Sequence, residues 1–289
     1  MPQPSTPKAA LWMAGWLVQL LAIAIAGREA LRALSVFQVM EVRSVLGFVL
    51  LLPLIHRAGG FAQLRTRRPF QHIVRNLVHY AAQLGWFLAL TLIPLGEVVA
   101  IEFTTPIWTA IMAAAFLGER MDGGKVLAVV LGLIGVVIIV RPGINAVSVG
   151  QLVVLLAAVA FGVSIVMMKS LTRTETTLRI IVWMTVVQSA VGLGPAVAVW
   201  TWPDTATWGW LVLVAFCGTF SHYCMARAML YADATIVVPM DFLRVPLAAT
   251  AGWLLYAERM DLVTVIGTVI ILGGNVLNLR SPATSRAAA

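Results

Sequence analysis

Charged residues are scarce in this chain. They make up 11% of its 289 residues, against roughly 25% in soluble globular domains, while hydrophobic residues make up 61%. The mean hydropathy is +0.94. A particle of this size with so little polar surface cannot be a water-soluble domain. The composition therefore predicts a chain that lies within a lipid bilayer.

Cysteine and histidine are scarce as well, with two and four residues. Cys217 and Cys224 are seven residues apart in one apolar stretch, so on a helix they lie about 10 Å apart, too far for a disulfide. We expect no metal site, because no set of ligands has a characteristic spacing. The phosphate-binding loop, the nucleophile elbow and the zinc-protease motif are also missing, so we expect no cofactor and no enzyme activity.

The net charge of +8 comes from basic residues in short segments between apolar stretches. This distribution argues against nucleic-acid binding and follows the excess of Lys and Arg on the cytoplasmic side of membrane proteins. With the N-terminus inside, only Arg28, Arg32, Arg141 and Arg259 fall on the outer side, so both termini are predicted to be cytoplasmic. The thirteen basic residues on the inner side are Lys8, Arg57, Arg65, Arg67, Arg68, Arg75, Arg120, Lys125, Lys169, Arg173, Arg179, Arg280 and Arg286.

Ten apolar stretches are near the roughly 20 residues that cross the hydrocarbon core of a bilayer. The sequence therefore predicts an all-α membrane protein with ten transmembrane helices. Residues 1–8 and 281–289, rich in Pro, Ala and Ser, are predicted to be cytoplasmic tails. The predicted spans cover residues 9–26, 33–55, 73–93, 96–117, 124–140, 150–169, 178–200, 207–230, 234–256 and 262–279.

One charged stretch occurs twice, because Gly118–Asp122 recurs as Ala257–Asp261. Further matches in the same register extend over about fifty residues, which indicates a duplicated unit. Five apolar stretches separate the two copies, and since five is odd the copies must lie on opposite faces of the membrane. The chain is thus predicted to form two inverted five-helix repeats, residues 9–141 and 150–280, an arrangement found in secondary transporters.

The fourth and fifth spans of each repeat have distinctive residues. Pro106 and Pro246 fall in the fourth spans, where a bundle interior can satisfy the carbonyl that a proline leaves free. Small residues fall at close spacing in the fifth spans and would let helix backbones approach closely, either between the two halves or between subunits of a homodimer. They are Ala128, Gly132, Gly135, Gly267, Gly273 and Gly274.

At these residues the chain resembles a known family, the EamA-type transporters of the drug/metabolite transporter superfamily. The similarity rests on Phe116–Arg120, on Arg67–Phe70 and on Ala89–Pro94, and it covers roughly residues 10–280. It implies a bacterial inner-membrane solute carrier that works by alternating access without an ATPase of its own. Members are associated with amino acids, sugars, cofactors and nucleotide-like solutes. Tyr256-Ala257 stands where the family usually has Leu-Gly.

Ionisable residues inside the predicted spans are candidates for substrate binding or ion coupling, because burying them costs about 2.5–3.5 kcal/mol at a helix centre. Asp241 and Arg244 are three residues apart and share a helix face, so they form either a structural ion pair or part of a central cavity. Glu102 is the counterpart of Asp241 in the first repeat. The inverted repeat predicts that these two carboxylates lie on opposite sides of the membrane midplane.

Arg43 lies near the middle of the second span and does not share a face with Glu41, two residues away. Its partner is predicted to be Glu102 or a carboxylate of the substrate, which a guanidinium binds in a bidentate manner. Polar and aromatic residues of other spans could line the same cavity or belong to the core. They are His79, Tyr80, Gln83, Trp108 and His222.

These residues offer both charge signs within one predicted cavity, which favours a zwitterionic substrate. We therefore expect an exporter of a small polar metabolite, an amino acid or an amino-acid-derived compound such as a metallophore. One alternative is an importer of a cofactor-like solute such as S-adenosylmethionine or a vitamin. The other is a membrane-embedded enzyme or assembly factor without transport activity.

Overall fold

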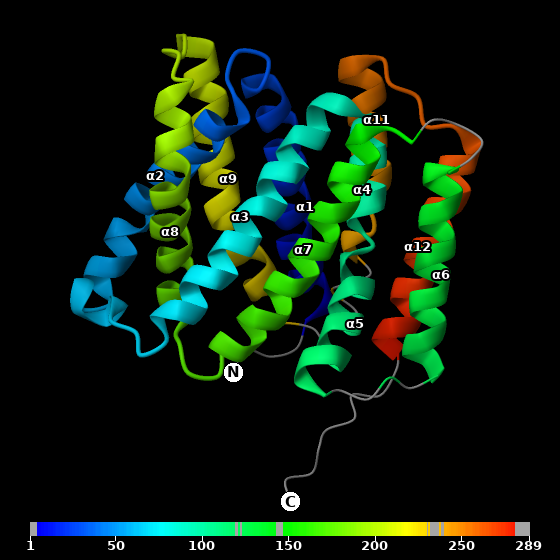
Figure 1. Cartoon of the computed structure of the whole chain (residues 1–289), viewed down its shortest axis with the longest axis horizontal. Coiled ribbons are helices and arrows are strands. Elements are labelled where there is room, and N and C mark those ends of the chain that lie inside the picture. Colours follow the sequence, from blue (N-terminus) through cyan, green and yellow to red (C-terminus); the bar gives the residue numbers. More distant parts are fainter. Residues whose placement is uncertain are drawn as a thin grey trace, which may run out of the picture.

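The computed structural model describes residues 5–118, 121, 123–142, 147–229, 231, 237 and 240–280, apart from the side chains of residues 117, 222, 226, 229 and 278–280. Every element in these residues is a helix (Figure 1). The elements are α1 (Thr6–Ala30), α2 (Val36–Arg57), the short 3-10 helix η1 (Phe61–Leu64), α3 (Pro69–Leu92), α4 (Leu95–Glu102), α5 (Thr105–Leu117), α6 (Gly123–Val140), α7 (Val149–Leu171), α8 (Thr177–Ala198), α9 (Thr205–Met229), α11 (Arg244–Tyr256) and α12 (Leu262–Arg280).

Seven segments in the described residues are long and apolar enough to cross a membrane, and α4 and α5 together form one of them. The prediction of ten spans is thus confirmed in part. Helix α3 is long enough, but polar residues such as His72 and Asn76 on its buried face lower its hydropathy. Helix α11 has 13 residues, and the apolar segment of α12 is Leu262–Leu277.

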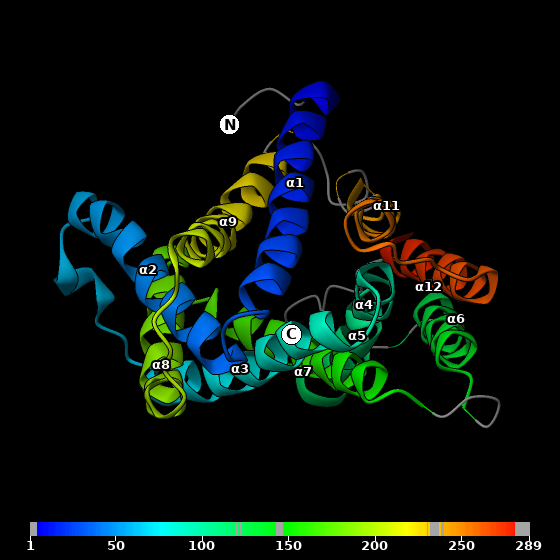
Figure 2. The ribbon, with the colours of Figure 1, turned by 90° about the horizontal axis from the view of Figure 1, so that it is seen from above.

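The two halves of the chain interleave. Helices of the first half pack against helices of the second: α1 against α9, α2 against α8, α3 against α7, α4 against α11, and α6 against α12. Viewed from above, α6 and α12 lie side by side at one edge of the bundle, and α2 lies beside α8 at the other (Figure 2). The main helix–helix contacts of the bundle are therefore between the two halves and not within one half.

The two copies of the repeated charged stretch begin at opposite ends of the bundle. Helix α5 ends at the bottom of Figure 1 and α11 ends at the top. The residues that follow them, Gly118 and Ala257, both have the left-handed conformation, with φ of 64° and 54°. Alanine adopts this conformation at a cost of about 1–2 kcal/mol, so the second copy keeps the helix ending without the glycine that favours it.

Glycines bring α6 and α12 into close contact. A Cβ atom on Gly135 would lie 2.7 Å from the carbonyl oxygen of Gly267, and one on Gly267 would lie 2.8 Å from that of Gly135. Gly274 meets the carbonyl oxygen of Ala128 in the same way, at 2.9 Å. The small residues of the fifth spans therefore pack the two halves together. A homodimer through these helices stays a prediction. It would have to use the faces of α6 and α12 that do not contact each other.

We expect Gly135→Ala to separate α6 from α12 and to lower the thermal unfolding temperature in detergent. Over-packing a close contact costs about 1–3 kcal/mol. Gly273→Ala is the matched control, because a Cβ there meets nothing within 4 Å and alanine is a better helix former than glycine. Equal stability of the two variants would contradict the close packing.

Candidate functional site

The fourth span of the first repeat is broken in the middle of the bundle. Helix α4 ends at Glu102, a turn of Phe103 and Thr104 follows, and Pro106 lies in the first turn of α5. Asn275 of α12 donates a hydrogen bond of 2.8 Å to the carbonyl of Phe103, which the break leaves without a helical partner. The second repeat has a turn at the matching residues, 242 and 243, before α11 begins. Such breaks supply polar groups at the depth where transporters bind their substrates.

Arg244 lies between two carboxylates at these breaks. Its Nη1 is 2.9 Å from Oε1 of Glu102, and its Nη2 is 3.5 Å from Oδ2 of Asp241. The three side chains are 10–17% exposed. The guanidinium carbon also lies 4.7 Å from the centre of the Phe103 ring. One cation thus faces two anions, so with both carboxylates ionised this charge cluster carries one net negative charge.

Each carboxylate of the charge cluster also accepts a hydrogen bond from a tryptophan. The indole of Trp86, on α3, donates to Oε2 of Glu102 at 2.8 Å. The indole of Trp16, on α1, donates to Oδ1 of Asp241 at 2.8 Å. Each carboxylate is therefore held by its own indole and by the shared guanidinium of Arg244. Four helices meet at the cluster: α1, α3, α4 and α11.

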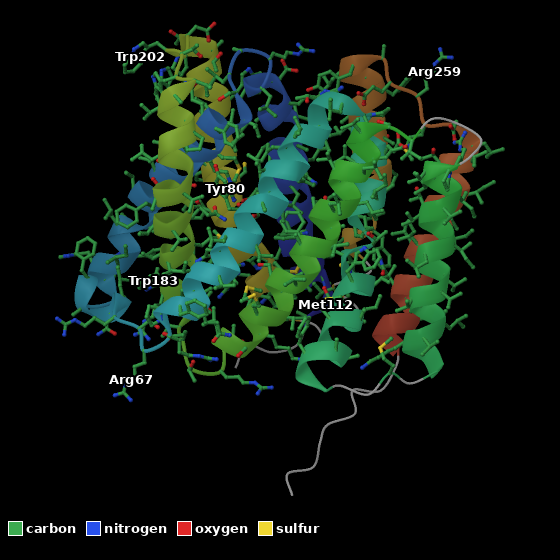
Figure 3. The ribbon with its side chains drawn as sticks, in the orientation of Figure 1. Arg67, Tyr80, Met112, Trp183, Trp202 and Arg259 are labelled. Carbon is green, nitrogen blue, oxygen red and sulfur yellow. The ribbon has the colours of Figure 1, made fainter. Side chains whose placement is uncertain are left out.

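A cavity of about 860 Å³ extends from the charge cluster to one end of the bundle. It passes Phe161 of α7 and reaches Lys125, Lys169 and Thr177, near the start of α6, the end of α7 and the start of α8. These helix ends lie at the bottom of Figure 1, the end that carries Arg67 in Figure 3. Its walls are largely apolar, with several aromatic rings. The basic side chains that line it are Arg43, Arg75, Lys125, Lys169 and Arg244, and the acidic ones are Glu102 and Asp241.

Polar contacts close the opposite end of the bundle. Glu258, from the second charged stretch, forms an ion pair with Arg28 of α1 and accepts a hydrogen bond of 2.8 Å from the backbone N–H of Leu95 at the start of α4. These contacts join α1, α4 and the segment between α11 and α12. Arg259 marks this end in Figure 3.

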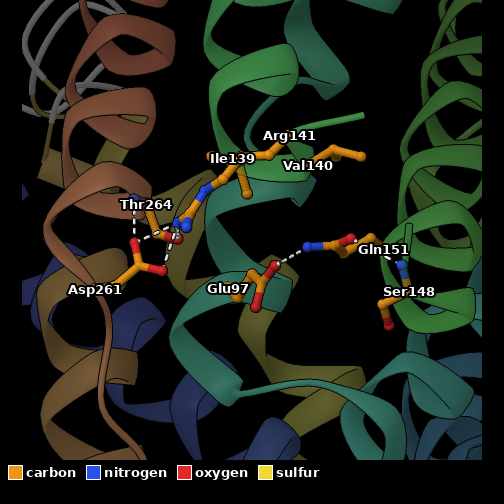
Figure 4. A pocket seen from close by; sticks show the side chains of 8 residues that line it. All are labelled: Glu97, Ile139, Val140, Arg141, Ser148, Gln151, Asp261 and Thr264. Atoms are coloured by element: carbon orange, nitrogen blue, oxygen red, sulfur yellow. Dashed lines mark hydrogen bonds and ion pairs between the residues drawn. The ribbon is translucent and has the colours of Figure 1, made fainter. Parts of the chain in front are cut away.

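A smaller hollow of about 190 Å³ lies at the same end, between α4, α6, α7 and α12 (Figure 4). Arg141 bridges to Asp261, and Gln151 donates a hydrogen bond of 2.6 Å to Glu97. The hydrogen bond from Arg141, with one from the backbone N–H of Thr264, lowers the pKa of Asp261 to about 2. The Asp261 bridge is therefore charged at any physiological pH.

Two interleaved halves with broken fourth spans around one cavity form a fold that can be compared with known proteins. The EamA-like transporter family matches residues 8–141 and again residues 148–280. The chain belongs to this family. It is a multi-pass membrane transporter and not an enzyme.

Several relatives share most of their length with this EamA-like transporter. It is 32% identical to a riboflavin transporter of Brucella anthropi, over 84% of this chain and 88% of the relative. It is 28% identical to an S-adenosylmethionine uptake transporter of Rickettsia prowazekii, over 82% and 80%. It is 27% identical to a pseudopaline exporter of Pseudomonas aeruginosa, over 85% and 86%. A crystal structure with 19% identity has the same fold, with a TM-score of 0.63 over 94% of this chain and 96% of the other.

Six of the nine residues singled out in the sequence line the cavity of this EamA-like transporter: Glu102, Asp241, Arg244, Arg43, His79 and Gln83. Tyr80 and Trp108 do not line it. The phenol of Tyr80 lies near Glu41 instead, and the Trp108 indole donates to Thr104 within its own half of the broken span. The side chain of His222 lies outside the described residues.

Two expectations are corrected. The alternative that pairs Arg43 with Glu102 is wrong, because Glu102 pairs with Arg244 and Arg43 donates to Oε1 of Gln83 at 3.2 Å. The position of the two carboxylates on opposite sides of the midplane stays a prediction, and the structure shows that both contact one guanidinium. Arg75, counted with the basic loop residues although it lies at the start of the predicted third span, is 5% exposed in α3 and lines the cavity. It fits there because α3 starts at Pro69, four residues before the predicted span, so that Arg75 lies in the second turn of the helix.

Sequence reasoning missed Trp16 and Asn275, which complete the charge cluster and the broken span. A signal existed for Asn275, because it is an amide within an apolar span. None existed for Trp16. The spacing of Arg75, His79, Gln83 and Trp86 on α3, three or four residues apart, was a readable sign of one polar face.

Proposed function

We propose that this transporter carries a zwitterionic, cofactor-sized metabolite across the bacterial inner membrane by alternating access. The proposal rests on one observation: the same cavity has negative charge at one place and positive charge at another. At its centre the charge cluster has a surplus carboxylate, while Arg43 and Arg75 have no carboxylate partner within the described residues. A volume of about 860 Å³ lies within the range of about 300–1,000 Å³ that holds drug-sized ligands.

Each part of such a substrate has a complementary group in the cavity. Arg43 and Arg75 offer planar donors to a carboxylate, and the charge cluster attracts an ammonium or sulfonium group. The rings of Trp16, Trp86 and Phe161 offer faces to a flat heterocycle. S-adenosylmethionine combines a carboxylate, an ammonium and sulfonium pair and a flat heterocycle. One relative is an S-adenosylmethionine uptake transporter. S-adenosylmethionine is therefore the substrate to test first.

A second candidate is the export of an amino-acid-derived compound, which needs the two charged regions but not the aromatic walls. The cavity extends to the end of the bundle that is predicted to be cytoplasmic, and such a compound would enter there. The similarity to a pseudopaline exporter supports this alternative.

The test is counterflow in proteoliposomes with labelled S-adenosylmethionine, with competition by decarboxylated S-adenosylmethionine, riboflavin and free amino acids. We expect saturable exchange and competition that weakens when the carboxylate is absent. Arg43→Met should lower the affinity for the intact substrate about tenfold and leave that for the decarboxylated analogue unchanged. Competition by riboflavin alone would show that the substrate is a neutral ring compound and not a zwitterion. Competition by amino acids alone would favour the second candidate.

The orientation can be tested with single cysteines in a variant without Cys217 and Cys224. Gly123→Cys and Arg259→Cys place thiols at exposed positions near the two ends of the bundle. With both termini in the cytoplasm, an impermeant thiol reagent added to whole cells should label position 259 and not position 123. Labelling of both positions from outside would contradict the inverted repeat. Labelling of position 123 alone would show that both termini lie outside the cell.

The closed outer end gives a further prediction. Glu258→Gln removes the ion pair with Arg28 and the charge on the Leu95 hydrogen bond, so open outer states should become more populated. We expect Ala110→Cys, in the cavity wall, to react about tenfold faster with the same reagent from outside, equal to about 1.4 kcal/mol. Arg259→Gln, an exposed neighbour, is the control. An unchanged rate would mean that Glu258 does not hold this end closed.

A further inference from the structure

A second buried carboxyl group lies outside the cavity. Glu41, on α2, is 3% exposed, and its Oε1 accepts a hydrogen bond of 2.5 Å from the hydroxyl of Ser189 on α8. Its Oε2 has no hydrogen-bond partner within the described residues. It does not belong to the charge cluster or to the cavity lining. The proposed transport function gives this group no role.

Other polar atoms without partners gather near Glu41. The hydroxyl of Tyr80, on α3, is buried and has no partner among the described residues, and neither has the amide group of Gln188 on α8. A Cβ on Gly192 would lie 2.9 Å from both the Tyr80 hydroxyl and Oε2 of Glu41, so glycine leaves room for the two groups to approach each other. Gln188 lies one turn before Gly192 on the same face of α8. A buried polar atom without a partner costs about 1–3 kcal/mol, so a bound species at this place would relieve a real cost.

No cation among the described residues faces Glu41. From α3 the titratable neighbour is Tyr80, and α8 brings Ser189 and Gln188, which carry no charge. Arg43, the nearest base on α2, points to Gln83 and to the backbone of Gly218 on α9. Helix η1 has no ionisable residue.

The described titratable side chains of α9 do not neutralise Glu41 either. Cys217 is a buried thiol, and Cys224 accepts a hydrogen bond from Gln19 of α1. Arg227 and Tyr223 contact Trp12, also on α1. A carboxylate buried without a cation is strongly destabilising.

We propose that Glu41 is a proton-binding site, with Tyr80 and Ser189 as positioning residues, and that its proton is coupled to transport. In the protonated state Oε2 carries the hydrogen and Ser189 donates to Oε1. A small shift of the Tyr80 side chain into the room beside Gly192 would bring its hydroxyl within reach of that hydrogen. Oε2 and the Tyr80 hydroxyl would then satisfy each other, and no net charge would be buried. Nothing else has to bind, because the proton neutralises the carboxylate by itself.

The position of Glu41 fits an occluded proton. Gln38, one turn earlier on α2, donates a hydrogen bond of 2.5 Å to the carbonyl of Thr201 and accepts one of 3.1 Å from its N–H. Trp202, the next residue, marks the upper end of the bundle in Figure 3, and Tyr80 lies below it. The contact between Gln38 and Thr201 thus covers Glu41 on the outer side. Separation of α2 from α8 would expose the group to the outside.

The first test does not depend on any substrate. Infrared difference spectra of the purified full-length protein are recorded during a pH titration, and the signal of a protonated carboxyl group is followed. Glu41→Gln should remove this signal, and Tyr80→Phe should shift it. Glu29→Gln is the control, because Glu29 pairs with Arg32 at 3.0 Å, and its replacement should leave the Glu41 signal in place. A signal that persists in Glu41→Gln would overturn the proposal.

The second test rests on the proposed function and uses its labelled substrate in proteoliposomes. Glu41→Gln should keep substrate exchange at equal pH and lose at least tenfold of the accumulation driven by a proton gradient, and Glu41→Asp should regain part of it. Accumulation driven by a sodium gradient alone, or by protons to the same extent in Glu41→Gln, would overturn the coupling. If the wild type exchanges none of the substrates, the proposed function fails, and the infrared result still decides whether Glu41 binds a proton.

Discussion

Replacing Arg244 by methionine should abolish transport and also lower the thermal stability of the protein. The substitution leaves Glu102 and Asp241 without their shared cation in a largely buried place. Breaking a buried ion pair by removing one partner costs about 3–5 kcal/mol. We expect the unfolding temperature in detergent to fall and substrate exchange to drop at least a hundredfold.

A triple variant separates stability from binding. Arg244→Met combined with Glu102→Gln and Asp241→Asn carries no unpaired charge, so much of the lost unfolding temperature should return. Binding of S-adenosylmethionine should stay lost, because the surplus carboxylate of the charge cluster is gone. Recovery of both properties would make the cluster a purely structural ion pair and would leave the zwitterion proposal without its central observation.

The two carboxylates should be needed for transport far more than the tryptophans that hold them. Glu102→Gln and Asp241→Asn remove the negative charge that the substrate cation meets, so each should lower exchange about a hundredfold while the protein still inserts in the membrane. Trp86→Phe and Trp16→Phe keep the carboxylates and remove one hydrogen bond each. Each carboxylate keeps its contact with Arg244 in these variants, so we expect a loss of about tenfold, which corresponds to about 1.4 kcal/mol, near the lower end of the range for a hydrogen bond to a charged group.

These four variants form matched pairs, each with a carboxylate and its own indole partner. Expression and insertion are compared first, and exchange is then measured at saturating substrate. Normal exchange in both carboxylate variants would show that neither carboxylate is required. Equal losses in a carboxylate variant and its tryptophan partner would assign the effect to the shape of the site and not to its charge.

The sequence predicted the helical membrane fold and the outline of the charge cluster because ionisable residues are rare in the spans. Glu102, Asp241 and Arg244 could be found since each is costly in lipid and needs a reason to be there. The repeat placed Glu102 and Asp241 at matching positions, and the structure joins them through Arg244.

The sequence could not predict which helices meet. A membrane helix is apolar toward lipid and toward its neighbours, so the period of its hydrophobic residues does not reveal its buried face. Trp16 looked like any other aromatic residue of an apolar span, although it donates a hydrogen bond to Asp241, 225 residues later in the chain. Arg75 looked like a residue of the interface because it follows a basic loop, although α3 carries it inside.

The interleaving of the halves affects how the protein is made. Each helix of residues 6–140 packs against a helix that is synthesised later, so the first half leaves the ribosome without its partners. Until α11 is made, Glu102 lacks Arg244, the cation that it pairs with in the complete bundle. The early half must therefore wait in a loosely packed state, open to lipid or to an insertion chaperone, and the bundle can close only after α11 has entered the bilayer.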